Sequence, residues 1–179
     1  MSLQSLVIST MLPVYIPLQL IDKSRNGIEI PITWQIPTII LLTLIFHKKV
    51  VIRAFSIYLI LGLFIAPVFH QGGSIGYLLT PNFGYLLGIY PLITIIDNLN
   101  NRNKINVVSF LINGFIAIVT MHLTGIFYNF IQTIIYGQFN IFLYNLGKYS
   151  AGKIGYHFLI LLPLILLFKP IKFFKNCKK

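Results

Sequence analysis

The sequence predicts an all-α integral membrane protein with six transmembrane helices. Of its 179 residues, 56% are hydrophobic and only 9% are charged, whereas soluble domains carry about 25% charged residues. A chain so poor in charge cannot cover a globular surface with polar side chains, so lipid must surround most of it. We therefore expect one transmembrane domain over residues 1–179, spanning a cell membrane several times.

Six apolar segments approach the length needed to cross a bilayer, which is about 20 residues in a helix. The second and fourth are short, and Pro37 and Pro91 lie in or near them. The first lacks the basic flank and small-residue cleavage site of a signal peptide, so we expect a retained helix. The expected helices cover residues 4–20, 33–47, 50–68, 82–96, 106–135 and 154–174.

The distribution of basic residues between these segments indicates their orientation. The second and fourth loops and the C-terminal tail hold ten Lys and Arg, whereas the first, third and fifth loops hold four. Because basic residues accumulate on the cytoplasmic side, we place both termini in the cytoplasm, including a basic tail over residues 175–179. The three odd-numbered loops then lie together on the outer face.

The net charge of +11 does not indicate a nucleic-acid partner. The basic residues fall between apolar runs and at the C-terminus, not on a soluble face that could display a basic patch. This placement suits a membrane protein next to anionic lipid, so we expect the lipid bilayer, and no nucleic acid, as a partner.

The residues needed for catalysis are scarce, so we do not expect an enzyme. The acidic residues are only Asp22, Glu29 and Asp97, and Cys177 in the tail is the only cysteine. No GxxxxGKS-type phosphate loop is present, so this chain does not hydrolyse ATP itself. We expect no metal site either, because no two histidines have the helical spacing of a metal pair. We interpret all four as structural: His47, His70, His122 and His157.

The stretch from Gly62 to Gly88 is the most unusual part of the chain. It carries no Lys, Arg, Asp or Glu and alternates glycines with aromatic residues. Small-molecule sites are mostly apolar and aromatic with a few placed polar groups, so we predict an outer-face binding site here; the alternative is an interfacial aromatic belt. The predicted site residues are Trp34, Gln35, Phe69, Gly72, Gly73, Tyr77, Asn82, Gly84, Tyr85, Lys148, Lys153 and Tyr156.

Three groups of residues in this region resemble the BioY proteins. Residues 30–35 resemble their "IPxTxQ" motif, and Tyr58 to Gly62 followed by Pro67 to Phe69 resembles their "YxxLG…PVF" run. Gly72-Gly73, Pro81, Gly84-Tyr85 and Gly88 match their "GG…GPTGGYLxG" signature. The similarity runs from about residue 29 to 90, and the order and spacing of the motifs agree.

The resemblance implies an S-component-like fold and a function in vitamin uptake. Such a protein is the biotin-binding membrane subunit of an energy-coupling-factor transporter in the plasma membrane of a prokaryote. It captures biotin at the outer face and works with a transmembrane coupling subunit and two ATPases, which use the ATP, so no cofactor is expected in this chain. Two alternatives stay open: an S component for another small vitamin, and a structural membrane protein without a ligand.

One part of the family pattern is altered here. BioY proteins carry an Asp and a Lys three residues apart at the start of the last helix, after a Pro-Gly. If Gly152 aligns with that glycine, Lys153 replaces the Asp and Tyr156 replaces the Lys. The polar head or carboxylate of the ligand is then held differently, or the ligand itself differs.

The chemistry of biotin assigns a role to most of the predicted residues. The amides of Gln35 and Asn82 can both donate to and accept from a ureido ring. Lys153 or Lys148 can pair with a carboxylate. Apolar surface comes from aromatic residues, namely Trp34, Phe69 and Tyr85.

Overall fold

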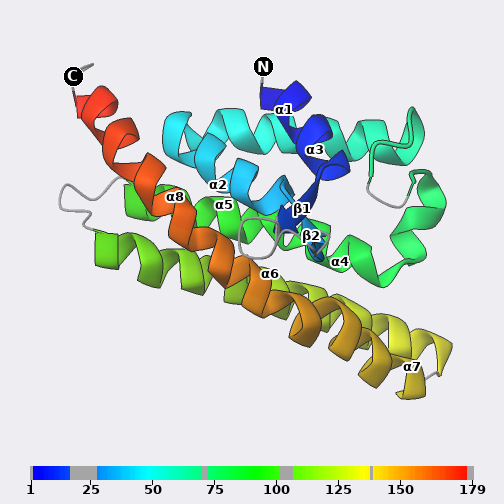
Figure 1. Ribbon diagram of the computed structural model, residues 1–179. Helices are drawn as coiled ribbons and strands as arrows, with labels where there is room; N and C mark the ends of the chain where they lie inside the picture. The colour runs from blue at the N-terminus through cyan, green and yellow to red at the C-terminus, as the bar shows by residue number, and fades with distance from the viewer. Residues whose placement is uncertain (1, 17–27, 70–71, 101–106, 138, 177–179) are drawn as a thin grey trace.

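The computed structural model describes residues 2–16, 28–69, 72–100, 107–137 and 139–176. Helices make up nearly all of this part of the chain, and one short two-stranded ribbon lies near its start (Figure 1). η2 is a short 3-10 helix and η3 a π-helical turn. In chain order the elements are α1 (Ser2–Met11), β1 (Pro13–Ile16), β2 (Ile28–Thr33), α2 (Gln35–Ile45), α3 (Lys48–Phe64), η2 (Ile75–Leu79), α4 (Pro81–Leu87), α5 (Ile89–Asn100), α6 (Val107–Tyr136), α7 (Phe139–Asn145), η3 (Leu146–Ala151) and α8 (Gly152–Asn176).

The first helix is shorter than the sequence predicted. A helix over residues 4–20 was wrong: α1 ends at Met11, and β1 then pairs antiparallel with β2. Pro13 explains the difference, because proline has no N–H to continue the helix and disfavours helical backbone at the preceding residue. The ribbon pairs Pro13 with Thr33, and the Trp34 N–H donates to the Leu12 carbonyl at 3.2 Å. These pairings place the start of α2 beside the end of α1.

The segment predicted as one helix over residues 82–96 is divided between α4 and α5, which meet at Gly88. Pro91 lies in the first turn of α5, where its missing N–H costs no hydrogen bond. A Cβ at Gly88 would lie 2.5 Å from the Met121 carbonyl oxygen of α6. The junction therefore lets α4 and α5 pack directly on α6. The other predicted segments coincide largely with α2, α3, α6 and α8.

The core of the bundle lies around α5. This helix packs against α2, α3 and α6, and Figure 1 shows α3 along one side of the bundle and α6 along the other. Leu92 and Ile93 of α5 are fully buried, as are Phe55 and Tyr58 of α3. Apolar side chains at these positions hold the central helices in fixed relative positions, which is what a site built from several helices requires.

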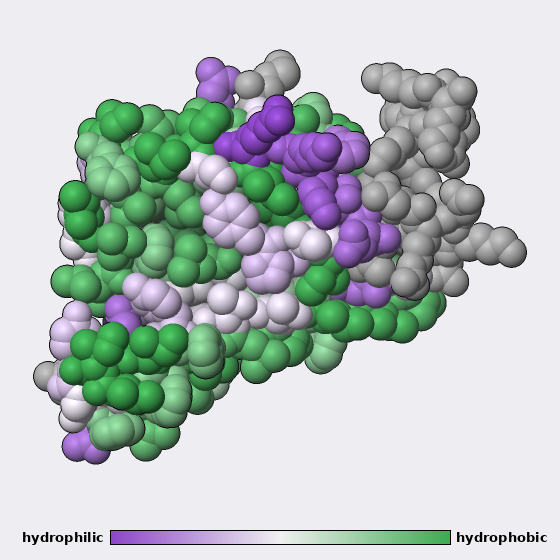
Figure 2. All heavy atoms as spheres, turned by 180° about the vertical axis from the view of Figure 1, so that it is seen from behind, coloured by the Kyte–Doolittle hydropathy of each residue, from purple (hydrophilic) through white to green (hydrophobic). Residues whose placement is uncertain are grey.

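The outside of the molecule is also strongly apolar. Figure 2 shows hydrophobic side chains over most of one face, with hydrophilic ones gathered mainly toward one end. Within the described residues, two helical stretches are long and apolar enough to cross a membrane, Val107–Tyr136 and Phe139–Leu166. Leu143 and Leu166 on the second stretch are 71% and 78% exposed. Apolar side chains on so much of the surface match lipid as the surrounding solvent.

Candidate functional site

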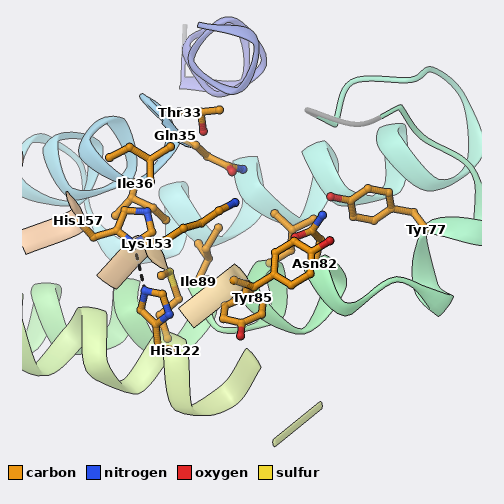
Figure 3. A pocket seen from close by; sticks show the side chains of 14 residues that line it. Thr33, Gln35, Ile36, Tyr77, Asn82, Tyr85, Ile89, His122, Lys153 and His157 are labelled. Atoms are coloured by element: carbon orange, nitrogen blue, oxygen red, sulfur yellow. Dashed lines mark hydrogen bonds between the residues drawn. The ribbon is translucent and has the colours of Figure 1, made fainter. Parts of the chain in front are cut away.

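A partly open cavity of about 120 Å³ lies where the start of α2, α4, α6 and the start of α8 come together (Figure 3). Its walls are apolar and aromatic with a few polar groups, the composition typical of small-molecule sites. The residues that line it come from eight different elements: Ile32, Thr33, Gln35, Ile36, Tyr77, Asn82, Tyr85, Leu86, Ile89, Met121, His122, Tyr149, Lys153 and His157.

Gln35 supplies a hydrogen-bond donor to this cavity. It is the first residue of α2, directly after the turn at Trp34 that ends the ribbon. Its side chain is only 8% exposed, and its amide nitrogen makes no hydrogen bond of normal length. A longer interaction joins this amide to the Tyr58 hydroxyl, which is already bonded to Thr10 at 3.2 Å. Buried amide groups are nearly always paired, so one without a close partner on a cavity wall marks a point where a ligand can bind.

The glycine-rich loop before η2 places Tyr77 on the cavity. Gly72 has a φ of 107° and Ser74 a φ of 136°, so the backbone turns through conformations that side chains disfavour. The Ser74 N–H is held by the Gly62 carbonyl at 3.0 Å. Behind Tyr77, the ring of Phe69 packs with a centroid distance of 4.5 Å. The loop therefore contributes shape, and Tyr77 is the residue through which it reaches the cavity.

The Tyr77 hydroxyl forms a hydrogen bond with Asn82, which also lines the cavity. Burial raises the pKa of the Tyr77 phenol above its usual value of 10.0. The phenol therefore stays protonated at physiological pH. Tyr77 and Asn82 together give this wall neutral donors and acceptors.

Lys153 supplies positive charge to the cavity. It is the second residue of α8 and is half-buried, with its ammonium 5.4 Å from the centre of the Tyr149 ring. No Asp or Glu is among the described residues that line the cavity. A cation without a carboxylate partner in its cavity favours an anionic group on the ligand.

Two histidines, which the sequence analysis interpreted as structural, also line the cavity. His122 Nε2 lies 3.1 Å from His157 Nδ1, joining α6 to α8 (Figure 3). His122 Nδ1 lies 3.4 Å from the Ser150 hydroxyl, and that hydroxyl lies 2.6 Å from the Tyr85 hydroxyl. Among the described residues, no group of three or more His, Cys, Asp or Glu could hold a metal ion. Hydrogen-bond contacts join the two rings to each other and, through Ser150, to Tyr85.

The structure brings five of the predicted site residues to the cavity and places the others elsewhere. Trp34 and Tyr156 are 41% and 38% exposed and do not line it. Lys148 instead makes cation–π contacts with the rings of Tyr144 and Tyr149. Phe69, Gly72, Gly73 and Gly84 shape the surroundings without lining it. The five that line it are Gln35, Tyr77, Asn82, Tyr85 and Lys153.

The two histidines were missed because 35 residues separate them, so no local spacing links them. A different signal was present: both lie in long apolar segments, where an ionisable side chain is expensive and usually functional. His122 is 2% exposed and His157 is 9% exposed.

Comparison with known proteins gives a consistent result. The sequence model of the family described as the BioY family matches residues 5–161. That range runs from α1 into α8 and includes every residue that lines the cavity. No protein with a curated description matches the sequence.

Among solved structures, the chain is similar to the crystal structure of the S-component for biotin from an ECF-type ABC transporter. The TM-score is 0.60, and the match covers 94% of this chain and 87% of that chain. The sequences are 19% identical. At this identity the similarity establishes the fold.

Proposed function

Because the chain belongs to the BioY family, we propose that this membrane protein is the substrate-binding subunit of a biotin uptake system. The observation that carries the proposal is the polar content of the cavity. It combines the Lys153 ammonium with the Gln35 amide nitrogen, which makes no hydrogen bond of normal length, and no described lining residue is acidic. A ligand with an anionic group and a separate hydrogen-bonding group would satisfy both.

Biotin has the functional groups that this cavity can bind. Its carboxylate pairs with Lys153, and its ureido ring exchanges hydrogen bonds with the amides of Gln35 and Asn82. Its bicyclic ring and aliphatic chain then lie against the apolar part of the wall. That part consists of Ile32, Ile36, Leu86, Ile89 and Met121, with the rings of Tyr77, Tyr85 and Tyr149. These residues take over the apolar role expected of Trp34 and Phe69.

The geometry favours a different alignment of this chain with the Asp–Lys pair of the family. With Gly152 aligned, Tyr156 would take the lysine position, yet it lies outside the cavity and is 38% exposed. A shift of three residues puts Lys153 at the lysine position and Ser150 at the aspartate position. Ser150 is 5% exposed and bonds to Tyr85 on the cavity wall. Lys153 would then keep the family role, whereas Ser150 would replace the aspartate and Lys148-Tyr149 would replace the Pro-Gly before it.

The same family membership supports a wider assembly. We infer that the chain crosses the membrane six times with both termini in the cytoplasm. The distribution of ten basic residues on the even loops and tail against four on the odd loops supports this orientation. The chain would deliver biotin inward with a transmembrane coupling subunit and two ATPase subunits. Co-purification of these subunits with the tagged chain from its native membrane would test the assembly.

The first experiment is calorimetric titration of biotin into the detergent-solubilised protein. We expect saturable binding at one site per chain. Riboflavin and thiamine, titrated in the same way, should give no heat above dilution. Saturable binding of one of these vitamins without binding of biotin would show that this vitamin, and not biotin, is the substrate. It would favour the S component for another vitamin, to which the altered Ser150–Tyr156 stretch points.

A structural membrane protein without a ligand would bind none of the three vitamins. It would also keep its function when the cavity wall is changed by Asn82→Ala. Loss of vitamin uptake in cells that produce this variant, with the protein still present in the membrane, would speak against the structural alternative.

A further inference from the structure

Four polar side chains beside the cavity form one continuous chain of hydrogen bonds. They come from four elements: His157 from α8, His122 from α6, Ser150 from η3 and Tyr85 from α4. The contacts measure 3.1 Å, 3.4 Å and 2.6 Å in that order. His122, His157 and Ser150 are each at most 9% exposed, so water cannot readily replace one member as partner of the next. We call these four residues the hydrogen-bond chain.

The number of protons limits how the hydrogen-bond chain can be arranged. A neutral imidazole has one N–H and one lone pair, and a hydroxyl has one O–H. With neutral imidazoles, all three contacts can be filled in three ways. In two of them every hydrogen is directed toward Tyr85 or every hydrogen toward His157; in the third, His122 and Tyr85 both donate to Ser150, whose oxygen has two lone pairs. The third leaves the buried Ser150 O–H without an acceptor among the described residues, so the first two are favoured. A doubly protonated His122 could donate at both ends, but it would place a second cation beside the cavity that already contains Lys153.

The two arrangements present opposite groups to a ligand. With the hydrogens directed toward Tyr85, Ser150 donates to the Tyr85 oxygen, so the Tyr85 O–H is free to donate and His157 Nε2 carries a lone pair. With the hydrogens reversed, Tyr85 donates to Ser150 and can only accept from a ligand. His157 Nε2 then carries the N–H.

The position of Lys153 decides between the two arrangements. Lys153 and His157 are four residues apart on α8, so they lie on one face of the helix, and both line the cavity. Lys153 interacts electrostatically with His157, so a lone pair on His157 Nε2 is attracted by the ammonium, whereas an N–H there is repelled. The arrangement with its hydrogens directed toward Tyr85 is therefore the more stable one.

We propose that His122 is a positioning residue that, together with His157 and Ser150, fixes Tyr85 as a hydrogen-bond donor to the ligand. The proposal rests on the proposed function of the cavity as the biotin site. The ligand atom opposite Tyr85 is then an acceptor oxygen, either of the ureido carbonyl or of the carboxylate. The hydrogen-bond chain selects ligands that place an oxygen at this point and rejects those that place an N–H there.

The direct test is nitrogen-15 NMR of histidine-labelled protein, which separates the tautomers by the shifts of the two ring nitrogens. We expect His122 and His157 both to carry the proton on Nδ1, in the free protein and with biotin bound. His122→Asn and His157→Asn variants assign the signals. Protons on Nε2 of both rings, or an imidazolium signal from either, would overturn the proposal. This outcome does not depend on binding, so it can fail while the proposed function holds.

A second test follows the effect on binding. His122→Phe should weaken biotin binding by about tenfold, the effect expected from one well-placed hydrogen bond. His122→Asn retains a donor next to Ser150 and should recover most of the affinity. His47→Phe is the matched control, because His47 lies exposed before α3 and should bind biotin normally. Equal losses in His122→Phe and His122→Asn would contradict a role through Ser150.

The ligand atom opposite Tyr85 is identified with two analogues. An analogue with a methyl group in place of the carboxylate lacks both acid oxygens, and 2-iminobiotin lacks the ureido oxygen. Tyr85→Phe should lose its effect on the analogue that lacks the oxygen bound by Tyr85 and should weaken the other about tenfold. An undiminished effect of Tyr85→Phe on both analogues would rule out an acceptor oxygen opposite Tyr85.

Discussion

The ring of Tyr85 on α4 occupies the space that a side chain at Gly125 on α6 would need. Tyr85 is also bonded to Ser150 at 2.6 Å and lines the cavity. The close approach of α4 and α6 at this point therefore determines where one wall of the cavity stands. Gly125 does not line the cavity, yet the position of Tyr85 depends on it.

We expect Gly125→Ala to impair binding through this contact. The added methyl group overlaps the Tyr85 ring, and inserting atoms into a packed core typically costs about 1–3 kcal/mol. Displacement of the ring should weaken biotin binding by about tenfold or more in calorimetric titration. Gly155→Ala on α8 is the control, because nothing lies within 4 Å of a Cβ there; unchanged affinity in Gly125→Ala would refute the argument.

Gln35→Leu should lower the affinity for biotin without lowering the stability of the unliganded protein. The Gln35 amide nitrogen is buried and has only a long interaction with the Tyr58 hydroxyl, and a buried donor without a good partner costs about 1–3 kcal/mol in the absence of a ligand. Its replacement by a leucine of similar size should leave the melting temperature of the unliganded protein unchanged or raised. Biotin affinity should fall by about tenfold, because the ligand loses this donor.

The control for Gln35→Leu is a glutamine whose amide is already bonded. Gln132 Nε2 donates to the Leu78 carbonyl at 3.3 Å, so Gln132→Leu should lower the melting temperature. If Gln35→Leu destabilised the unliganded protein as much as Gln132→Leu, its amide would have a structural partner and no special role for the ligand.

The helical plan could be read from the sequence because apolar runs of sufficient length have few alternatives in lipid. The strand at residues 13–16 could not, since its formation depends on pairing with residues 28–33 far along the chain. The same limit applies to the site. Gln35, Asn82 and Tyr85 lie in or near motifs and were predicted as site residues, and all three line the cavity. His122 and His157 meet only when α6 and α8 pack together.

Exposure of the lysines near the start of α8 could not be predicted either. Lys148 and Lys153 are five residues apart, and the sequence offered both as partners of a carboxylate. The π-helical turn η3 separates them, with Lys148 exposed and Lys153 half-buried on the cavity wall. A π-turn shifts the phase of the helix by one residue, which hydrophobic periodicity does not reveal.

These two lysines give a matched pair of variants with the same change in net charge. Lys153→Met should weaken biotin binding by about 10- to 100-fold, as expected for the loss of a charged hydrogen bond. Lys148→Met should bind biotin normally. Biotinol, which lacks the carboxylate, should bind the wild type and Lys153→Met with similar affinity in calorimetric titration. A large loss for biotinol would show that Lys153 contacts another part of the ligand.

The orientation in the membrane can be tested with the single cysteine of the chain. Cys177 belongs to the basic tail that the charge distribution places in the cytoplasm. A membrane-impermeant maleimide should therefore leave the protein unlabelled in intact cells and label it once the cells are permeabilised. The reporter for the outer face is the double variant Cys177→Ser, Ile75→Cys. Ile75 is 57% exposed and lies in η2, directly after the glycine-rich loop. This variant should be labelled in intact cells, since the proposed function requires the cavity to open outward. Labelling of both reporters from the same side would contradict the proposed orientation.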